Sequence, residues 1–424
     1  MKKLISLLVV LVAAGCSPAK NTVSSIAYYK HADSLLEQKD FFSARDYIAA
    51  NPNRFGKMHK ALLDAKISHA FNKPQLSNEN IDLLFTRYKA QLSDSVIVSL
   101  LEMKQANHGR LYQYTEAKEA VSEILEHYHS GLPQKDKDDY QNMKAIWTAL
   151  SGQPAQQVLH RGSLIIKMTR DKANLTNLPV RTRNGVIDFI FDTGANLSTV
   201  TQSTAQRMMM KTLGATIEVG SITGAKVMSD LAVCPEFSIG NITVKNAVFL
   251  VFPDAALAVP QIEYQINGII GFPVIEALKE VQITQQDEFI VPDTPSVVHE
   301  QNMALDFLTP VIRIGDEYFT FDTGATGTSL YKKYFEKHRD KVVGKYELAG
   351  LVLGGAGGAA TKKGYNFTYT PVVNGKQLTI DKVQLFIDDI EDDKSHYYGN
   401  IGQDLIKQFK KMTLNFDAMS IRFD

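Results

Sequence analysis

The tripeptide Asp192-Thr193-Gly194 is followed by Ala195 and recurs as Asp322-Thr323-Gly324, which is again followed by an alanine, Ala325. Each copy comes directly after an apolar stretch, residues 186–191 and residues 317–321. With Asp and Thr each about 5% and Gly about 7% of residues, such a tripeptide is expected roughly 0.1 times in a chain of this length. Two copies in matched surroundings therefore indicate a duplicated unit.

The duplication continues downstream at a nearly constant offset. Asp322 lies 322 − 192 = 130 positions after Asp192, and Gly402 lies 402 − 271 = 131 positions after Gly271. Three apolar pairs keep the offset of 131: Ile275 and Ile406, Leu278 and Phe409, and Ile283 and Leu414. Both units are rich in short runs of Val, Ile, Phe and Thr punctuated by glycine, a pattern typical of β-strands. We therefore predict two related, mostly β units, residues 160–292 and residues 293–424.

The preceding part of the chain has a helical pattern. Apolar residues recur there at helical spacing, most clearly at Ile81, Leu84, Phe85, Tyr88 and Leu92. Several such stretches, joined by short polar turns, predict a solenoid-like α-helical array over residues 22–152 without a named repeat. The whole chain is thus expected to be an α+β multidomain protein.

The first residues are typical of an export signal. Lys2 and Lys3 precede an apolar run, residues 4–14, which is too short to span a bilayer. Residues 12–16 resemble a bacterial lipobox, although Ala13 replaces the usual leucine. This resemblance implies a lipoprotein signal at residues 1–16 and acylation of Cys16. An ordinary secretory signal and an N-terminal core helix are the alternatives.

An acylated Cys16 would place the protein in the cell envelope, anchored to the membrane by lipid. Residues 17–20 contain no acidic residue, which by resemblance to lipoprotein sorting rules favours the outer membrane, facing the periplasm. Surface display is left open. The other cysteine, Cys234, is interpreted as a small buried hydrophobe.

Composition narrows the class of partner. The 46 basic and 46 acidic residues cancel, so the chain lacks the positive excess that nucleic-acid binding normally needs. The only approach to a zinc motif begins at His299 and has Met303 where the second histidine should stand. The glycines from Gly354 onward lack the ending of a phosphate loop, and no nucleophile elbow of a serine hydrolase occurs.

The repeated motifs resemble the aspartic peptidases of the pepsin and retropepsin clan, in particular bacterial retropepsin-like members. The resemblance covers residues 160–424. It implies a two-lobed acid protease domain that hydrolyses a polypeptide bound in extended conformation, with no cofactor and no metal. By this resemblance Asp192 and Asp322 are the catalytic pair. The supporting residues of the catalytic loops are Thr193, Gly194, Ala195, Thr323, Gly324, Ala325, Gly271 and Gly402.

The residue types suit that chemistry. Two neighbouring carboxyl groups cannot both ionise easily, so they share a proton, and one acts as base while the other acts as acid. Gly194 and Gly324 allow close approach of the two loops. By resemblance, the two threonines bond across to the opposite loop. The alanines Ala195 and Ala325 replace a hydroxyl donor common in pepsin-like relatives, which predicts an optimum between weakly acidic and near-neutral pH.

Two glycine-rich tips are candidates for the flaps that cover a bound peptide. The first contains Thr223 and Gly224, and the second contains Gly355, Ala356 and Gly357. Plain surface hairpins are the alternative interpretation, since neither tip carries the tyrosine of pepsin-type flaps.

Two further hypotheses remain open at the level of sequence. The chain could be a catalytically inactive lipoprotein that binds peptides, with the helical region as an interaction surface for a protein partner. Alternatively, each Asp-Thr-Gly unit could pair with a unit of another molecule, which the constant internal offset disfavours.

Overall fold

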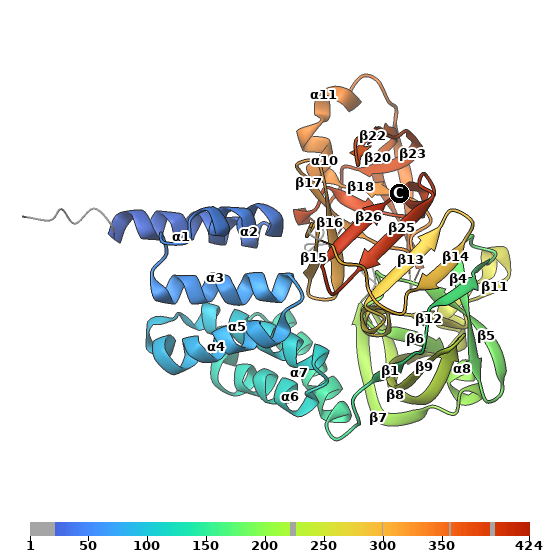
Figure 1. The fold of residues 1–424 in the computed structure, drawn as a ribbon, viewed down its shortest axis with the longest axis horizontal. Coiled ribbons are helices and arrows are strands. Elements are labelled where there is room, and N and C mark those ends of the chain that lie inside the picture. The colour runs from blue at the N-terminus through green and yellow to red at the C-terminus, as the bar shows by residue number, and fades with distance from the viewer. Residues whose placement is uncertain (1–21, 221–225, 299, 356–357, 391–394) are drawn as a thin grey trace, which may run out of the picture.

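The computed structural model describes residues 22–220, 226–298, 300–355, 358–390 and 395–424. Helices form one side of the molecule and two groups of strands form the other, one above the other in Figure 1. The predicted fold class is confirmed: a helical region is followed by a largely β region. None of the described helices is long and apolar enough to cross a membrane.

The helical region is a stack of antiparallel hairpins whose apolar faces meet. Asp40 and Ser93 cap the starts of α2 and α5, accepting hydrogen bonds from backbone N–H groups three residues on. Ile81 and Leu84, two of the periodic apolar positions, are fully buried between α3, α4 and α5. The helices are α1 (Thr22–Glu37), α2 (Phe41–Ala50), α3 (Lys57–Ala70), α4 (Pro74–Tyr88), α5 (Asp94–Arg110), α6 (Tyr114–Glu123) and α7 (Gln134–Leu150), with short helical turns η1 (Lys89–Gln91), η2 (Ile124–Tyr128) and η3 (His129–Gly131).

The first group of strands forms a nine-stranded sheet with the order β1-β9-β6-β12-β5-β4-β8-β7, and β3 pairs with β4. An additional pairing of β8 with β9 closes this sheet on itself. The ring of Phe249 packs edge-on against Phe189 and Phe237 in its interior. The strands are β1 (Gln157–Leu159), β3 (Thr169–Arg170), β4 (Thr176–Thr182), β5 (Gly185–Phe191), β6 (Ser198–Thr201), β7 (Lys211–Gly220), β8 (Lys226–Ile239), β9 (Ile242–Phe252) and β12 (Gly268–Ile270), with α8 (Gln202–Arg207), α9 (Phe272–Ala277), η4 (Asp254–Leu257), η5 (Pro260–Ile262) and the pair β10 (Ala258–Val259) and β11 (Tyr264–Gln265).

The second group has the order β15-β16-β17-β24-β18-β23-β20-β19. It repeats the central pairing of the first, because β24 is parallel to β17 and antiparallel to β18, as β12 is to β5 and β6. The elements are β15 (Met303–Asp306), β16 (Thr309–Ile314), β17 (Glu317–Phe321), β18 (Ser329–Leu330), β19 (Leu348–Gly355), β20 (Gly358–Tyr369), β23 (Ile380–Phe386) and β24 (Gly399–Ile401), with α10 (Lys332–Lys337), α11 (Arg339–Val342), α12 (Gln403–Ile406) and the pair β21 (Val372–Val373) and β22 (Lys376–Gln377).

A five-stranded sheet joins the two groups. Its order is β2-β14-β13-β25-β26, so three strands that end by Val291 lie beside the chain's last two strands. Val281 of β13 lies opposite Leu414 of β25, and Ile283 lies opposite Met412. The strands are β2 (Leu164–Lys167), β13 (Glu280–Thr284), β14 (Glu288–Val291), β25 (Lys411–Asn415) and β26 (Ser420–Phe423). The division into units 160–292 and 293–424 stays a prediction, and each predicted unit contributes strands to this joining sheet.

The helical region contacts both groups of strands (Figure 1). Lys39, after α1, pairs with Asp306 at 2.7 Å, and Arg110, at the end of α5, pairs with Glu276 of α9 at 2.6 Å. Asn142 of α7 exchanges two hydrogen bonds of 2.8 and 2.9 Å with the backbone of Glu218 in β7. The helices therefore brace the β region at several separate points.

Candidate active site

The two aspartates stand at equivalent corners of the two sheets. Asp192 follows β5 and Asp322 follows β17. The backbone N–H of Asp192 donates to the carbonyl oxygen of Ile270 at 3.1 Å, and that of Asp322 donates to Ile401 at 3.0 Å. Each loop therefore leaves its sheet directly after a hydrogen bond between two parallel strands. The two aspartates thus occupy equivalent backbone positions.

Thr193 and Thr323 fasten the two loops to each other. Each backbone N–H donates to the hydroxyl of the opposite threonine at 3.0 Å. The Thr193 hydroxyl then donates to the carbonyl of Phe321 at 3.1 Å, and the Thr323 hydroxyl donates to Phe191 at 2.9 Å. Both threonines are buried, so four cross-loop hydrogen bonds form away from water, where an unpaired group is costly. The structure thus brings the two Asp-Thr-Gly loops of this one chain into a single site.

Gly194 and Gly324 lie against the opposite aspartates. A Cβ atom on Gly194 would stand 2.7 Å from Cγ of Asp322, and a Cβ on Gly324 would overlap the carboxyl group of Asp192. The N–H of Gly194 donates to its own loop's Asp192 at 2.8 Å, and that of Gly324 donates to Asp322 at 2.7 Å. Close approach is therefore the reason for glycine at both positions.

The carboxyl pair is electrostatically coupled. The pKa of Asp192 is raised well above its ordinary value, first by desolvation of its carboxyl group and then by the negative charge of Asp322 and a hydrogen bond with it. Backbone N–H groups of Gly194 and Ala195 oppose this rise. Asp192 therefore keeps a proton at a pH where an ordinary aspartate has lost it.

Gly271 and Gly402 lie directly behind the loops. A Cβ on Gly271 would stand 2.6 Å from the carbonyl carbon of Leu197, and one on Gly402 would stand 2.5 Å from the carbonyl oxygen of Gly327. The next residue in each case donates its N–H to a loop alanine: Phe272 to Ala195 at 2.8 Å, and Gln403 to Ala325 at 2.9 Å. These glycines allow α9 and α12 to support the loops from behind.

The flap candidates fall partly outside the described residues. Thr223 and Gly224 follow β7, and Ala356 and Gly357 follow β19, but none of the four is described. The strands leading to both tips form antiparallel hairpins, and Gly355 lies opposite Gly358 in the second. Cys16 also lies outside the described residues. Among the described residues, no three His, Cys, Asp or Glu side chains converge as metal ligands.

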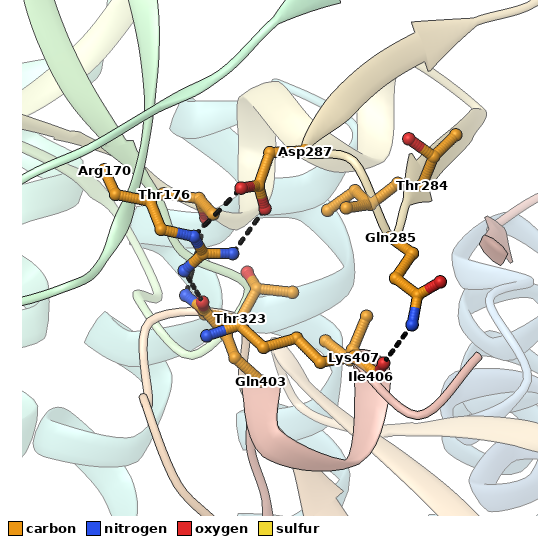
Figure 2. A pocket seen from close by; sticks show the side chains of 10 residues that line it. Arg170, Thr176, Thr284, Gln285, Asp287, Thr323, Gln403, Ile406 and Lys407 are labelled. Carbon is orange, nitrogen blue, oxygen red and sulfur yellow. Dashed lines mark hydrogen bonds and ion pairs between the residues drawn. The ribbon is translucent and has the colours of Figure 1, made fainter. Parts of the chain in front are cut away.

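Sequence reasoning missed a polar network under the loop of Asp322, shown in Figure 2. Gln403 donates to the carbonyl oxygen of Thr323 at 2.7 Å and accepts from Arg170 at 2.8 Å. Arg170 is in turn held by both carboxylate oxygens of Asp287. The available signal was an asymmetry in the repeat, since the residue after Gly402 is glutamine and the residue after Gly271 is Phe272.

Comparison with known proteins finds one family match within the β region. Residues 178–274 match the family model for aspartyl proteases, a segment that includes Asp192 and Gly271. Among solved structures, the chain is similar to a retropepsin-like aspartic protease from Rickettsia conorii, with 19% identity over 32% of this chain and 92% of that one and a TM-score of 0.21. No curated protein matches the chain. The family match thus falls within the first group of strands and the residues just after it.

Proposed function

We propose that this protein is an aspartic endopeptidase that hydrolyses peptide bonds with a water molecule activated between Asp192 and Asp322. The observation that carries the proposal is the reciprocal bonding of Thr193 and Thr323, because it sets two equivalent carboxyl groups in one site. The raised pKa of Asp192 supports it, since such a pair shares a proton under mild conditions.

The reaction follows from one ionised and one protonated carboxyl group. The carboxylate takes a proton from water as the water oxygen bonds to the peptide carbonyl carbon, and the carboxylic acid donates its proton to the carbonyl oxygen. A tetrahedral diol results. A proton then passes to the amide nitrogen as the C–N bond breaks, which releases an amine and a carboxylic acid.

The substrate of such a fold is a polypeptide. Extended binding is the mode we propose, because an extended strand can satisfy its backbone groups at a hairpin and alternate its side chains between pockets. The hairpins β7–β8 and β19–β20 are the elements that would cover it. Catalysis is favoured over peptide binding alone, since a binder has no need of two carboxyl groups packed together at an electrostatic cost.

Digestion of an unstructured protein such as casein tests the proposal. The purified chain is incubated between about pH 3 and about pH 8, and products are followed by mass spectrometry. Endoproteolytic fragments from the intact chain and none from Asp322→Asn are expected. Absence of cleavage across this range, with casein still bound, would favour the inactive peptide-binding protein.

The helical region is proposed as a support for the peptidase and as a docking surface for a protein partner. Its support role follows from the buried Arg110, which pairs with Glu276 of α9 at the junction. Expressing residues 156–424 alone tests this: we expect an unstable or poorly active fragment. A fragment as active and stable as the whole chain would contradict the support role.

Lipid anchoring through Cys16, with an outer-membrane location facing the periplasm, is likewise a proposal. It is supported by the sequence of residues 1–20 alone. Fractionation of cells that express the chain tests it, because Cys16→Ser should move the protein out of the membrane fraction. An unchanged distribution would contradict lipid anchoring.

A further inference from the structure

The two catalytic loops differ in what contacts the carbonyl group after each aspartate. The carbonyl oxygen of Thr323 accepts a 2.7 Å hydrogen bond from the buried side chain of Gln403. The equivalent position of the first unit, 131 residues earlier, is Phe272, whose side chain carries no hydrogen-bond donor. Among the residues that the structure describes, no side chain donates to the carbonyl oxygen of Thr193. The site is therefore asymmetric although its loops are repeats.

The orientation of the Gln403 amide follows from its neighbours. Arg170 has only donors, and one of its N–H groups lies 2.8 Å from Oε1 of Gln403. The amide NH₂ must then face the carbonyl oxygen of Thr323, to which it donates at 2.7 Å. Asp287 binds Arg170 through both carboxylate oxygens, and the carbonyl of Asn174 accepts from it at 2.9 Å. Gln403 is thus held in one orientation by a fixed partner.

This contact reaches the catalytic carboxyl group through one peptide unit. The Thr323 carbonyl and the Gly324 N–H belong to the same peptide, and that N–H donates to Oδ1 of Asp322 at 2.7 Å. A donor on the oxygen of a peptide polarises it and makes its N–H a stronger donor. A stronger donor favours the ionised form of the carboxyl group that accepts from it. The corresponding Gly194 N–H contacts Asp192 without this support.

We propose that Gln403 is a positioning residue that concentrates the negative charge of the pair on Asp322, making Asp322 the base and Asp192 the acid. The inference rests on the proposed peptidase function and assigns the two roles within it.

Four charged side chains lie near Gln403: those of Arg170, Asp287, Asp404 and Lys407. Arg170 and Asp287 are paired with each other. Asp404 of α12 accepts the N–H and hydroxyl of Thr328 at 2.8 and 2.6 Å. Lys407, at the end of α12, lines the same pocket, and burial followed by the charge of Arg170 lowers its pKa. Gln403 connects this cluster to the loop of Asp322, because it contacts both Arg170 and the carbonyl oxygen of Thr323.

The test is a pH profile of kcat/KM for Gln403→Met, which keeps the side-chain length but removes the donor. Gln285→Met is the matched control, because Gln285 lines the same pocket and donates to the carbonyl of Lys407 instead. Without the donor, the base takes up its proton more readily, so the low-pH limb should move up by about 0.3 to 0.6 pH unit. We also expect kcat to fall roughly tenfold with KM within about twofold.

The control variant Gln285→Met should show the same low-pH limb of kcat/KM as the unmodified protein. If kcat falls in Gln403→Met while the low-pH limb of kcat/KM stays in place, the role of Gln403 is purely structural. That result would overturn the proposal. If Gln403→Met does not fold, Arg170→Met replaces it, since losing the partner that orients the amide should move the limb in the same direction by a smaller amount. An unmoved limb in a folded Arg170→Met would also overturn it.

A second measurement does not depend on activity. Carbon-13 NMR of the aspartate carboxyl groups, assigned with Asp192→Asn and Asp322→Asn, reports which carboxyl is ionised midway through the pair's titration. We expect Asp322 ionised and Asp192 protonated, with the preference reduced in Gln403→Met. The reverse assignment overturns the inference. The expected assignment in a chain that cleaves nothing would refute the peptidase function and leave the inferred asymmetry standing.

Discussion

Asp192→Asn should stabilise the folded protein at neutral pH while it abolishes activity. The pKa of Asp192 is raised in the folded state well above its ordinary value of 3.8 by desolvation and by the charge of Asp322. Such a group favours folding fully below its unfolded pKa, and that contribution is lost as the pH rises through the folded pKa. At pH 7 Asp192 is ionised in the unfolded chain, so folding must either desolvate its charge or bind a proton, and a neutral asparagine of the same shape removes that cost.

The magnitude is set by the charge repulsion that the variant removes. Two unit charges about 4 Å apart repel by about 4 kcal/mol at an effective dielectric constant of 20. A gain of up to about 4 kcal/mol corresponds to a rise in Tm of up to roughly 16 °C for a domain of this size.

Thermal unfolding followed by circular dichroism at several pH values measures this gain. The difference between Asp192→Asn and the unmodified protein should be largest at about pH 7 and should shrink toward the unfolded pKa. Asp188→Asn is the control, because Asp188 is exposed on the same strand and should give no such pH-dependent difference. A Tm for Asp192→Asn equal to or below that of the unmodified protein at pH 7 would refute the reasoning.

Three further predictions concern the loops. Thr323→Val leaves the buried N–H of Thr193 and the carbonyl of Phe191 without partners, so it should lower the free energy of unfolding by about 2 to 4 kcal/mol in urea titrations; a loss below about 0.5 kcal/mol would contradict this. Gly194→Ala should reduce kcat/KM at least tenfold by displacing the opposite carboxyl group, whereas Gly131→Ala in the helical region, where a Cβ meets nothing within 4 Å, should not; equal kinetics for both would argue against close approach. Ala325→Thr should move the low-pH limb of kcat/KM downward from an optimum that lies between weakly acidic and neutral pH, because an added hydroxyl can stabilise the ionised pair; an optimum below about pH 3 in the unmodified protein would contradict it.

Local patterns were enough to predict the class of fold. Helical spacing identified an apolar face on which Ile81 and Leu84 are fully buried, because a helix must cover its apolar side whatever its neighbours are. The repeated tripeptides predicted equivalent corners, and the structure places Asp192 and Asp322 at the ends of β5 and β17. The cross-loop role of the threonines was inferred from family resemblance, and the four hydrogen bonds of the structure supply its physical basis.

Contacts between distant polar residues could not be predicted in this way. Arg170 and Gln403 are 233 positions apart, and neither stands in a periodic pattern that would single it out. Asn142 resembles any solvated helix residue, yet its amide pairs with the backbone of Glu218. Such contacts depend on how finished elements pack, which composition and spacing do not encode. The flap candidates Thr223, Gly224, Ala356 and Gly357 stay predictions.

The most direct test of the central claim compares the two single variants with the double variant. If Asp192 and Asp322 form one site, kcat/KM for a fluorogenic peptide should fall to the same residual level in Asp192→Asn, in Asp322→Asn and in the double change, because residues that act as a unit are not additive. Substantial activity in either single variant, or a further large loss in the double variant, would contradict a single two-aspartate site.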